Sequence, residues 1–366
     1  MDKKKLLGLF RGTALLCVIA TLILALGCAT LPAEPEVWAP GLTEPSSTIS
    51  TEESTGATTE ATTEPSISPT TEPSTEPSAE PTTEPSQAPT AEPTVPPTQG
   101  PTEPESSFEI HFIDVGQADA ALVICDGKTM LIDGGNADDS NLMYAYLKKL
   151  NIKHLDYVIG THAHEDHIGG IAGALNYASV GIAYCPSTSY STNAFRNFVN
   201  ALNKHGVSIT VPTPGLTFQL GSATCTILAV NTDKADVNNT SIVMRIVYGE
   251  TTFLFVGDAE REVEQVLLDR GVDLSATVLK VGHHGSRSST SYVFLREIMP
   301  EYAVICVGKG NTYGHPTSDV LSRLRDADVT TFRTDMQGDI LCVSDGTKVT
   351  FTVSKNANAD VFGNLN

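Results

Sequence analysis

The stretch that decides the fold reads Thr161-His-Ala-His-Glu-Asp-His-Ile-Gly-Gly170. Three imidazoles and the carboxylate of Asp166 are crowded within it as candidate metal ligands, the imidazoles at His162, His164 and His167. We expect a loop here, because a helix would spread these side chains over several faces. Neutral imidazole and carboxylate are ligands of zinc and its neighbours, and two interleaved half-sites predict two metal ions. A histidine-rich surface loop is the alternative, and the order of the residues argues against it.

The sequence on either side of this decamer predicts how the backbone holds it. The run from His154 to Gly160 is largely apolar and typical of a buried strand that ends at the motif. Gly169 and Gly170 follow the ligands, and we expect them to let the chain turn tightly into the next helix. The candidate ligands are therefore predicted to lie at the end of a strand.

With these residues and several others, the chain resembles a known family. His-x-His-x-Asp-His followed by Gly-Gly is similar to the signature of the metallo-β-lactamase fold superfamily of hydrolases. Other segments resemble, in order, the soluble hydrolase domain of the ComEC DNA-uptake proteins: His111–Ala120, Leu131–Gly135, Asn238–Val243, Phe255–Ala259, Leu279–Ser286 and Tyr313–Pro316. The resemblance covers about residues 108–353, and Ala118 departs from the family pattern, which has Gly there.

The fold that the resemblance implies is a four-layer αββα sandwich of the α/β class, with its active site at the strand ends between two sheets. The pattern of predicted elements agrees with it. Residues 108–133 predict three strands, two of them joined by a hairpin turn at Asp126-Gly127. Residues 140–150 and 192–205 predict helices, and helix and strand alternate from about residue 259.

The decamer supplies ligands for two metal ions, and a later carboxylate is expected to join them. We expect His162 and His164 to hold the first ion. Asp166 and His167 are expected to hold the second. Asp258 lies between an apolar strand and a helix, where a carboxylate either caps the helix or bridges two metals. The resemblance implies the bridging role, and it separates the chain from antibiotic-hydrolysing relatives, which generally lack this Asp.

The predicted first ion is short of one ligand. The resemblance implies a third His between the decamer and Asp258, and that stretch contains only His205, at a predicted helix end. Water, or the side-chain oxygen of Asn239 or Ser241, would then complete the shell. Because oxygen in place of nitrogen hardens the site, manganese competes better with zinc. We therefore expect two divalent ions, zinc first and manganese as the alternative.

Two adjacent histidines follow a predicted strand at residues 276–281. Since adjacent side chains diverge, His283 and His284 are not expected to share one role. The resemblance to phosphodiesterases of this fold implies that His284 completes the second metal's shell and that His283 is catalytic, in contact with the phosphate or as proton donor. Asp166 is expected to serve catalysis as well as metal binding. His315 is a further candidate catalytic residue, with a structural role as the alternative.

Two more carboxylates lie near predicted strand ends. Asp133 is expected to fix the metal loop by hydrogen bonds, with direct metal binding as the alternative. Asp119, like Gln117, could face the cleft, and the sequence leaves this open.

Residues 1–30 predict an export signal, because three lysines precede an apolar stretch. Ala25-Leu-Gly-Cys28 approximates a lipoprotein cleavage site, with Cys28 as the acylated N-terminus. An uncleaved anchor over residues 12–29 is the alternative, and simple secretion is a third. Either of the first two would tether the domain to a membrane outside the cytoplasm.

Residues 31–107 predict a disordered linker rich in Thr, Glu, Pro and Ser. At roughly 3.1 Å per residue, about 65 extended residues reach on the order of 200 Å, enough to cross a cell wall. Of the net charge of −20, the linker contributes −14 and the first thirty residues +3, so residues 108–366 carry −9. An acidic domain argues against non-specific nucleic-acid binding, although bound metals can reverse the local field.

Taken as a whole, residues 108–366 predict a tethered, extracytoplasmic hydrolase that cleaves a phosphodiester with two metal ions, and the resemblance implies extracellular DNA as its substrate. A phosphocholine or teichoic-acid esterase, or a lactonase, is the alternative enzyme. A catalytically degenerate surface-binding module is the alternative from another class. The oligomeric state is left open. The domain's cysteines are expected to be small buried hydrophobic residues rather than disulfides: Cys125, Cys185, Cys225, Cys306 and Cys342.

Overall fold

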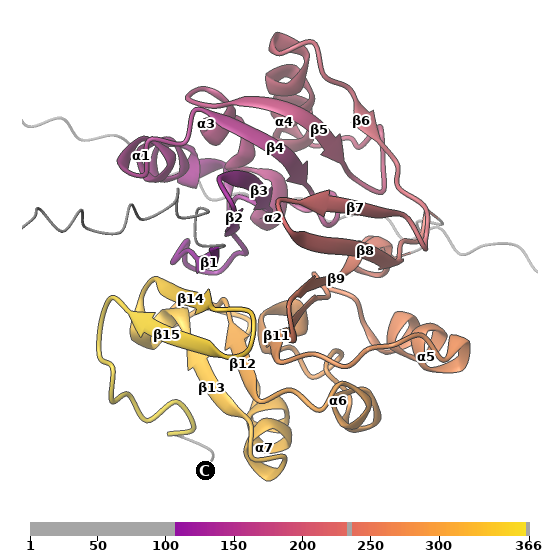
Figure 1. Cartoon of the computed structure of the whole chain (residues 1–366), viewed down its shortest axis with the longest axis vertical. Coiled ribbons are helices and arrows are strands. Elements are labelled where there is room, and N and C mark those ends of the chain that lie inside the picture. The colour runs from indigo at the N-terminus through magenta and orange to yellow at the C-terminus, as the bar shows by residue number, and fades with distance from the viewer. Residues whose placement is uncertain (1–106, 233–235, 364–366) are drawn as a thin grey trace, which may run out of the picture. The chain divides into compact units, whose positions relative to one another are not determined.

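The computed structural model describes residues 107–363 apart from 233–235, and the strands of this part form two sheets (Figure 1). The first sheet has the order β15 (Val349–Val353), β14 (Ile340–Ser344), β1 (Phe108–Phe112), β2 (Ala121–Cys125), β3 (Lys128–Ile132), β4 (His154–Ile159), β5 (Ser179–Tyr184) and β6 (Ile209–Thr210). The second has the order β13 (Thr330–Arg333), β12 (Tyr302–Ile305), β11 (Val278–Lys280), β10 (Thr251–Phe255), β9 (Val243–Tyr248), β8 (Ala223–Ala229) and β7 (Thr217–Leu220).

Helices cover the outer face of each sheet (Figure 1). Those that pack on the first sheet are α1 (Ser140–Lys149), α3 (Ile171–Leu175) and α4 (Asn193–Lys204). Those that pack on the second are α5 (Arg261–Arg270), α6 (Tyr292–Ile298) and α7 (Ser318–Asp326). Shorter turns are α2 (Glu165–Ile168), α8 (Thr334–Gln337), η1 (Ala137–Asp139), η2 (Asn238–Thr240) and η3 (Gly282–Gly285). The predicted four-layer αββα sandwich is confirmed.

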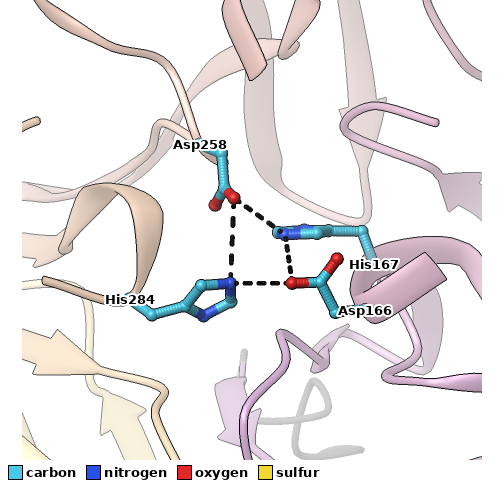
Figure 2. Close-up of side chains that lie close together, drawn as sticks. All are labelled: Asp166, His167, Asp258 and His284. Atoms are coloured by element: carbon cyan, nitrogen blue, oxygen red, sulfur yellow. Dashed lines mark ion pairs between the residues drawn. The ribbon is translucent and has the colours of Figure 1, made fainter. Parts of the chain in front are cut away.

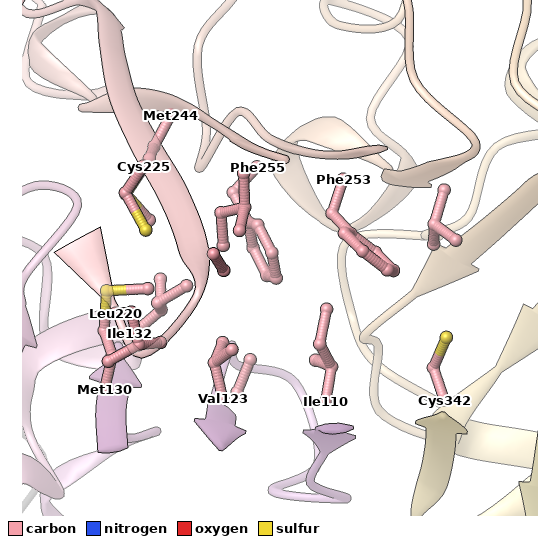
Figure 3. Packing of buried hydrophobic residues seen from close by; sticks show 14 of the residues in the cluster. Ile110, Val123, Met130, Ile132, Leu220, Cys225, Met244, Phe253, Phe255 and Cys342 are labelled. Atoms are coloured by element: carbon pink, nitrogen blue, oxygen red, sulfur yellow. The ribbon is translucent and has the colours of Figure 1, made fainter. Parts of the chain in front are cut away.

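The central core lies between the two sheets, where side chains from both point toward one another (Figure 3). Alternate residues of β1 face inward, because successive side chains of a strand point to opposite sides. Phe108 stacks on Phe253 of β10 with ring centroids 4.6 Å apart, and Phe112 stacks on Phe255 at 5.9 Å. Stacked aromatic pairs add about 0.5–1.5 kcal/mol each beyond their buried area. This core fixes the two sheets whose strand ends carry the site.

The cysteines of the domain form no disulfides and are buried, which confirms the expectation that they act as small hydrophobic residues. The predicted hairpin at Asp126-Gly127 joins β2 to β3. The strands β5 and β7 were not predicted. Residues 1–106, which include the predicted signal or anchor and nearly all of the linker, lie outside the described residues. Within the described part, no helix is both long enough and apolar enough to cross a membrane.

Candidate metal centre

The decamer leaves the end of β4 as an extended segment and then forms a single helical turn. His162 and His164 lie in the extended part, and His164 is the N-cap of α2. Asp166 and His167 lie inside α2, so the expectation of a loop throughout was wrong. One turn is compatible with metal binding because only two of the ligands lie within it, at positions about 100° apart around the helix axis.

Gly169 and Gly170 are needed for close packing and not for an unusual turn. The chain turns there from α2 into α3, as predicted, but both residues have negative φ angles, −60° and −83°, which any residue adopts. A Cβ on Gly170 would lie 2.0 Å from the carbonyl oxygen of Gly134, and one on Gly169 would lie 2.3 Å from the amide nitrogen of Ala137. The amide of Gly134 also donates to the carbonyl of His167 at 2.7 Å. The ligand segment is thereby locked against the loop that follows β3.

Four side chains from three separate segments converge on one point (Figure 2). Asp166 and His167 come from α2, Asp258 follows β10, and His284 lies in η3. The Nε2 atom of His167 is 3.3 Å from Oδ2 of Asp258. The Nε2 atom of His284 is 3.3 Å from Oδ2 of Asp166 and 3.7 Å from Oδ2 of Asp258. This is a ligand set of two imidazoles and two carboxylates.

Several atoms of this set are buried without a hydrogen-bond partner: His167 Nε2, His284 Nε2 and Asp258 Oδ1. Leaving a buried polar atom unpaired costs about 1–3 kcal/mol, more when it is charged. A divalent cation would satisfy these atoms together, since neutral imidazole and carboxylate are suitable ligands. The residues present therefore fit a metal ion.

The far sides of the two rings are held by buried carboxylates. His167 Nδ1 is 2.8 Å from Oδ2 of Asp133, whose carboxylate also accepts from the amide and hydroxyl of Thr161. Asp133 thus fixes the loop by hydrogen bonds, as predicted. His284 Nδ1 hydrogen-bonds the backbone carbonyl of Cys306 at 3.0 Å and also lies 3.1 Å from Oδ1 of Asp119. A carboxylate behind a histidine orients the ring and leaves Nε2 to face a metal.

His162 and His164 form a second group beside the first. His162 Nε2 is 3.0 Å from Nδ1 of His164 and 3.8 Å from Oδ2 of Asp258. The same Asp258 oxygen therefore lies near both half-sites, the position that a bridging ligand needs.

A cavity of about 340 Å³ opens beside these groups, and His162 and His167 lie buried behind its lining. His315 enters it from the loop after β12, and its ring meets that of His283 edge to face, with centroids 5.6 Å apart. The lining residues are Gln117, His164, Glu165, Asp166, Asn238, Asp258, His283, His284, Tyr313 and His315. The structure thus brings the predicted catalytic residues and metal ligands together at the same opening.

The family model of the Metallo-beta-lactamase superfamily matches residues 113–309. The chain belongs to this superfamily. Curated relatives include ComE operon protein 3 of Bacillus subtilis, 31% identical over 64% of this chain and 33% of the relative. Competence protein ComA of Neisseria gonorrhoeae is 29% identical over 64% of this chain and 32% of that protein. This chain spans about a third of the length of these relatives. Among solved structures, the metallo-beta-lactamase fold protein YhfI of Bacillus subtilis aligns with a TM-score of 0.44 and 14% identity, over 65% of this chain and 100% of that one.

In this superfamily member, the two adjacent histidines of η3 converge on Asp258, although divergent directions were expected. Both residues have left-handed backbone conformations, with φ of 49° for His283 and 50° for His284. Their Nε2 atoms lie 3.6 Å and 3.7 Å from the same Oδ2 of Asp258. Left-handed conformations cost non-glycine residues about 1–3 kcal/mol and cluster at functional sites. The turn therefore serves the site rather than the stability of the fold.

The oxygens suggested for the first ion's missing ligand are both used elsewhere. The Asn239 side-chain oxygen accepts from the amide of Glu260, and the Ser241 hydroxyl accepts from the amide of Asp258, each at 3.0 Å. His205 is exposed at the end of α4 and bonds to the backbone of α3. Of the ligands suggested for the first ion's third position, water remains. His283, whose Nε2 lies 3.6 Å from Oδ2 of Asp258, is an alternative third ligand.

The buried carboxylates of the site shift the pKa values of its histidines. Burial would lower the pKa of His284, but Asp258 and Asp119 raise it to about 10. Burial acts the same way on His167, and nearby carboxylates raise its pKa well above the usual value. Burial would raise the pKa of Asp166, but His167 and His284 hold it below its usual range. The carboxylates therefore favour positive charge at both rings, and a divalent cation would supply that charge in place of the protons.

Sequence reasoning missed two supporting residues. Lys280 is buried in β11 with its Nζ 2.8 Å from Oδ2 of Asp119, so this ion pair holds the carboxylate behind His284. A lone lysine in the apolar run 276–281 was the available signal. Glu260 Oε1 lies 3.1 Å from Nδ1 of His283, and nothing in its sequence context marked it.

Proposed function

We propose that this superfamily hydrolase is a binuclear metal-dependent phosphodiesterase that acts outside the cytoplasm. One observation supports this most directly. Four candidate ligands converge beside the cavity that His283 lines: Asp166, His167, Asp258 and His284. One of them, Asp258, also has its Oδ2 atom near His162 of the other pair of candidate ligands. A bridged pair of ions beside a proton donor is the arrangement that cleaves phosphodiesters.

In this proposal, His162 and His164 would hold the first ion, and Asp166, His167 and His284 would hold the second. Asp258, which lies near both groups, would contribute to both. When bound, the two ions supply a hydroxide near neutral pH and neutralise charge on the phosphoryl oxygens.

The protein's own part in the reaction is to hold and orient protons and substrate. His283 donates the proton on its Nε2 to the leaving oxygen, and Glu260 accepts a hydrogen bond from Nδ1 and fixes the ring. The Ser288 hydroxyl donates to the same Glu260 oxygen at 2.8 Å and keeps that carboxylate in place. His315 packs against His283 from the other side and restricts its ring further.

We further propose an extracellular, tethered location and a nucleic-acid substrate. The proposed tether is Cys28 or the apolar stretch before it, and the linker would carry the domain through the cell wall. The name of the Neisseria gonorrhoeae relative refers to competence, and this supports extracellular DNA as the first substrate to test.

A surface-binding module is the second candidate, because no described third histidine besides His283 is placed to complete the first ion's shell. Such a module would hold fewer than two ions per chain and would show no turnover.

The test is a substrate panel offered to the full-length chain loaded with zinc or with manganese. The panel contains single-stranded and duplex DNA, a bis-aryl phosphodiester, a phosphocholine ester and a lactone. We expect hydrolysis of the phosphodiesters, lost in Asp258→Ala and retained in the control His205→Ala. Hydrolysis of the phosphocholine ester or the lactone alone would refute the proposal.

A further inference from the structure

An exposed tyrosine stands at the mouth of the catalytic cavity. Tyr313 is 71% exposed, yet it lines the same cavity as Asp258, His283 and His315. A single exposed aromatic residue is common on protein surfaces and means little alone. Its position beside the proposed proton donor is what calls for an explanation.

The ring is continuous with the catalytic groups. Tyr313 stacks on His315 with centroids 5.8 Å apart and planes 24° from parallel. His315 in turn meets the ring of His283, whose Nε2 lies 3.6 Å from Oδ2 of Asp258. One face of Tyr313 is therefore supported by an imidazole, and most of the remaining ring surface is open to a ligand.

The loop that carries Tyr313 is braced rather than loose. The side-chain oxygen of Asn311 accepts from the amides of Tyr313 and His315, both at 3.1 Å. The Asn311 side-chain nitrogen donates to the carbonyls of Gly308 and His315, at 2.9 and 2.6 Å. The amide of Gly308 donates to the side-chain oxygen of Gln117 at 3.1 Å. A ring held in place in advance loses little freedom when a ligand stacks on it.

The charge of the cavity favours stacking as the source of affinity. Among the described residues that line it, none is Lys or Arg, and three are carboxylates: Glu165, Asp166 and Asp258. Ordinary nucleic-acid sites gain most of their affinity when basic side chains displace counterions from the phosphates. This cavity cannot gain affinity in that way, because no Lys or Arg is among its described lining residues. Stacking of a base on an aromatic side chain does not depend on a basic surface.

We propose that Tyr313 is the stacking platform for a nucleobase whose adjoining phosphodiester lies at the metal centre, so that the site takes single-stranded nucleic acid. This inference rests on the proposed function and adds a base-binding subsite to it. A quaternary ammonium group could also sit on an aromatic face, but such groups are held by cages of several rings. Tyr313 is the one Phe, Tyr or Trp among the described residues that line the cavity, which favours a planar base.

Binding tests the subsite without relying on turnover. Calorimetry on the metal-loaded full-length chain would compare thymidine 5′-monophosphate, deoxyribose 5-phosphate and phosphocholine. Tyr313→Ala should weaken binding of the nucleotide about 5- to 150-fold, the range for loss of one stacked base. The same variant should bind deoxyribose 5-phosphate with unchanged affinity, because this ligand has no base. Tyr313→Phe should bind the nucleotide with the affinity of the native protein, because the ring is kept. The control is Tyr292→Ala, an exposed tyrosine on α6 that does not line the cavity.

Hydrolysis separates failure of this inference from failure of the proposed function. Single-stranded oligothymidylate and an abasic oligonucleotide of equal length are the paired substrates. If both are cleaved and Tyr313→Ala changes neither rate nor nucleotide binding, the subsite is wrong and the phosphodiesterase stands. If neither is cleaved but Tyr313→Ala still weakens nucleotide binding, the subsite stands and the phosphodiesterase is wrong. A variant that loses phosphocholine binding and keeps nucleotide binding would overturn the base-stacking proposal.

Discussion

Replacing His283 and His284 one at a time by alanine should separate proton donation from metal binding. His284 is buried, with Nδ1 bonded to the Cys306 carbonyl at 3.0 Å and 3.1 Å from Asp119, and with Nε2 facing Asp166 at 3.3 Å. Its removal takes away one of the four convergent ligands. Since changes in residues that only support a ligand already cost 10–100-fold in metal affinity, we expect His284→Ala to lose about one metal equivalent and nearly all activity.

His283 differs because its side chain is 21% exposed and its Nδ1 is held by Glu260. His283→Ala should keep both metal equivalents and lose about 10²–10⁴-fold in turnover, the usual scale for a positioned proton donor. That range corresponds to about 3–5 kcal/mol in the activation barrier. Glu260→Gln should lower turnover less, with the metals retained, because the ring stays in place but is held less firmly.

The assay combines metal analysis with rates on two diesters that differ in leaving group. The deficit of His283→Ala should shrink on an activated aryl diester, which needs little help from a proton donor. Metal loss confined to His283→Ala would show that His283, not His284, is the ligand. Full activity in both variants would place η3 outside the active site and refute the phosphodiesterase account.

Three further outcomes are expected. Asp166→Ala and His167→Ala should each lose about one metal equivalent in elemental analysis, whereas His205→Ala should lose none; metal loss in the last would mean that His205 is a ligand. Cys28→Ala should abolish lipid labelling and leave a longer precursor in the membrane, while unchanged size and anchoring would favour a transmembrane anchor. In the metal-free protein, carboxylates outweigh burial and raise the pKa of His284 from 6.5 to about 10. Protonated His284 therefore stabilises the folded state fully below pH 6.5, and this contribution is lost as the pH rises toward 10. The unfolding temperature of the metal-free protein should fall across that window, and an unfolding temperature that does not change with pH there would contradict this.

The sequence predicted the features that depend on local pattern. Residues 192–205 have helical spacing, and the structure places α4 there, capped by the Thr192 hydroxyl, which accepts from the amide of Phe195. The identity and spacing of the decamer were enough to predict a metal site, and the family resemblance of the decamer and six other segments implied the sandwich fold. Asp258 was singled out because it follows an apolar strand, and the structure places it among the other candidate ligands.

The parts that could not be predicted depend on long-range contacts or on backbone geometry. Two consecutive left-handed residues in η3 are not signalled by sequence, so His283 and His284 were expected to diverge. Glu260 and Lys280 act through partners that lie 23 and 161 positions away in the chain, His283 and Asp119. The need for glycine at position 170 likewise comes from the backbone carbonyl of Gly134, in the loop after β3, which leaves no space for a Cβ atom.

The central claim, two metal ions joined by Asp258, is tested most directly by metal analysis of the full-length chain and its Asp258→Ala variant. The native chain should hold two divalent ions per molecule. Because Asp258 Oδ2 lies within 3.8 Å of His162 Nε2 and 3.3 Å of His167 Nε2, its loss should weaken both ions and abolish phosphodiester hydrolysis. One ion in the native chain, or two in the variant with activity intact, would contradict the claim.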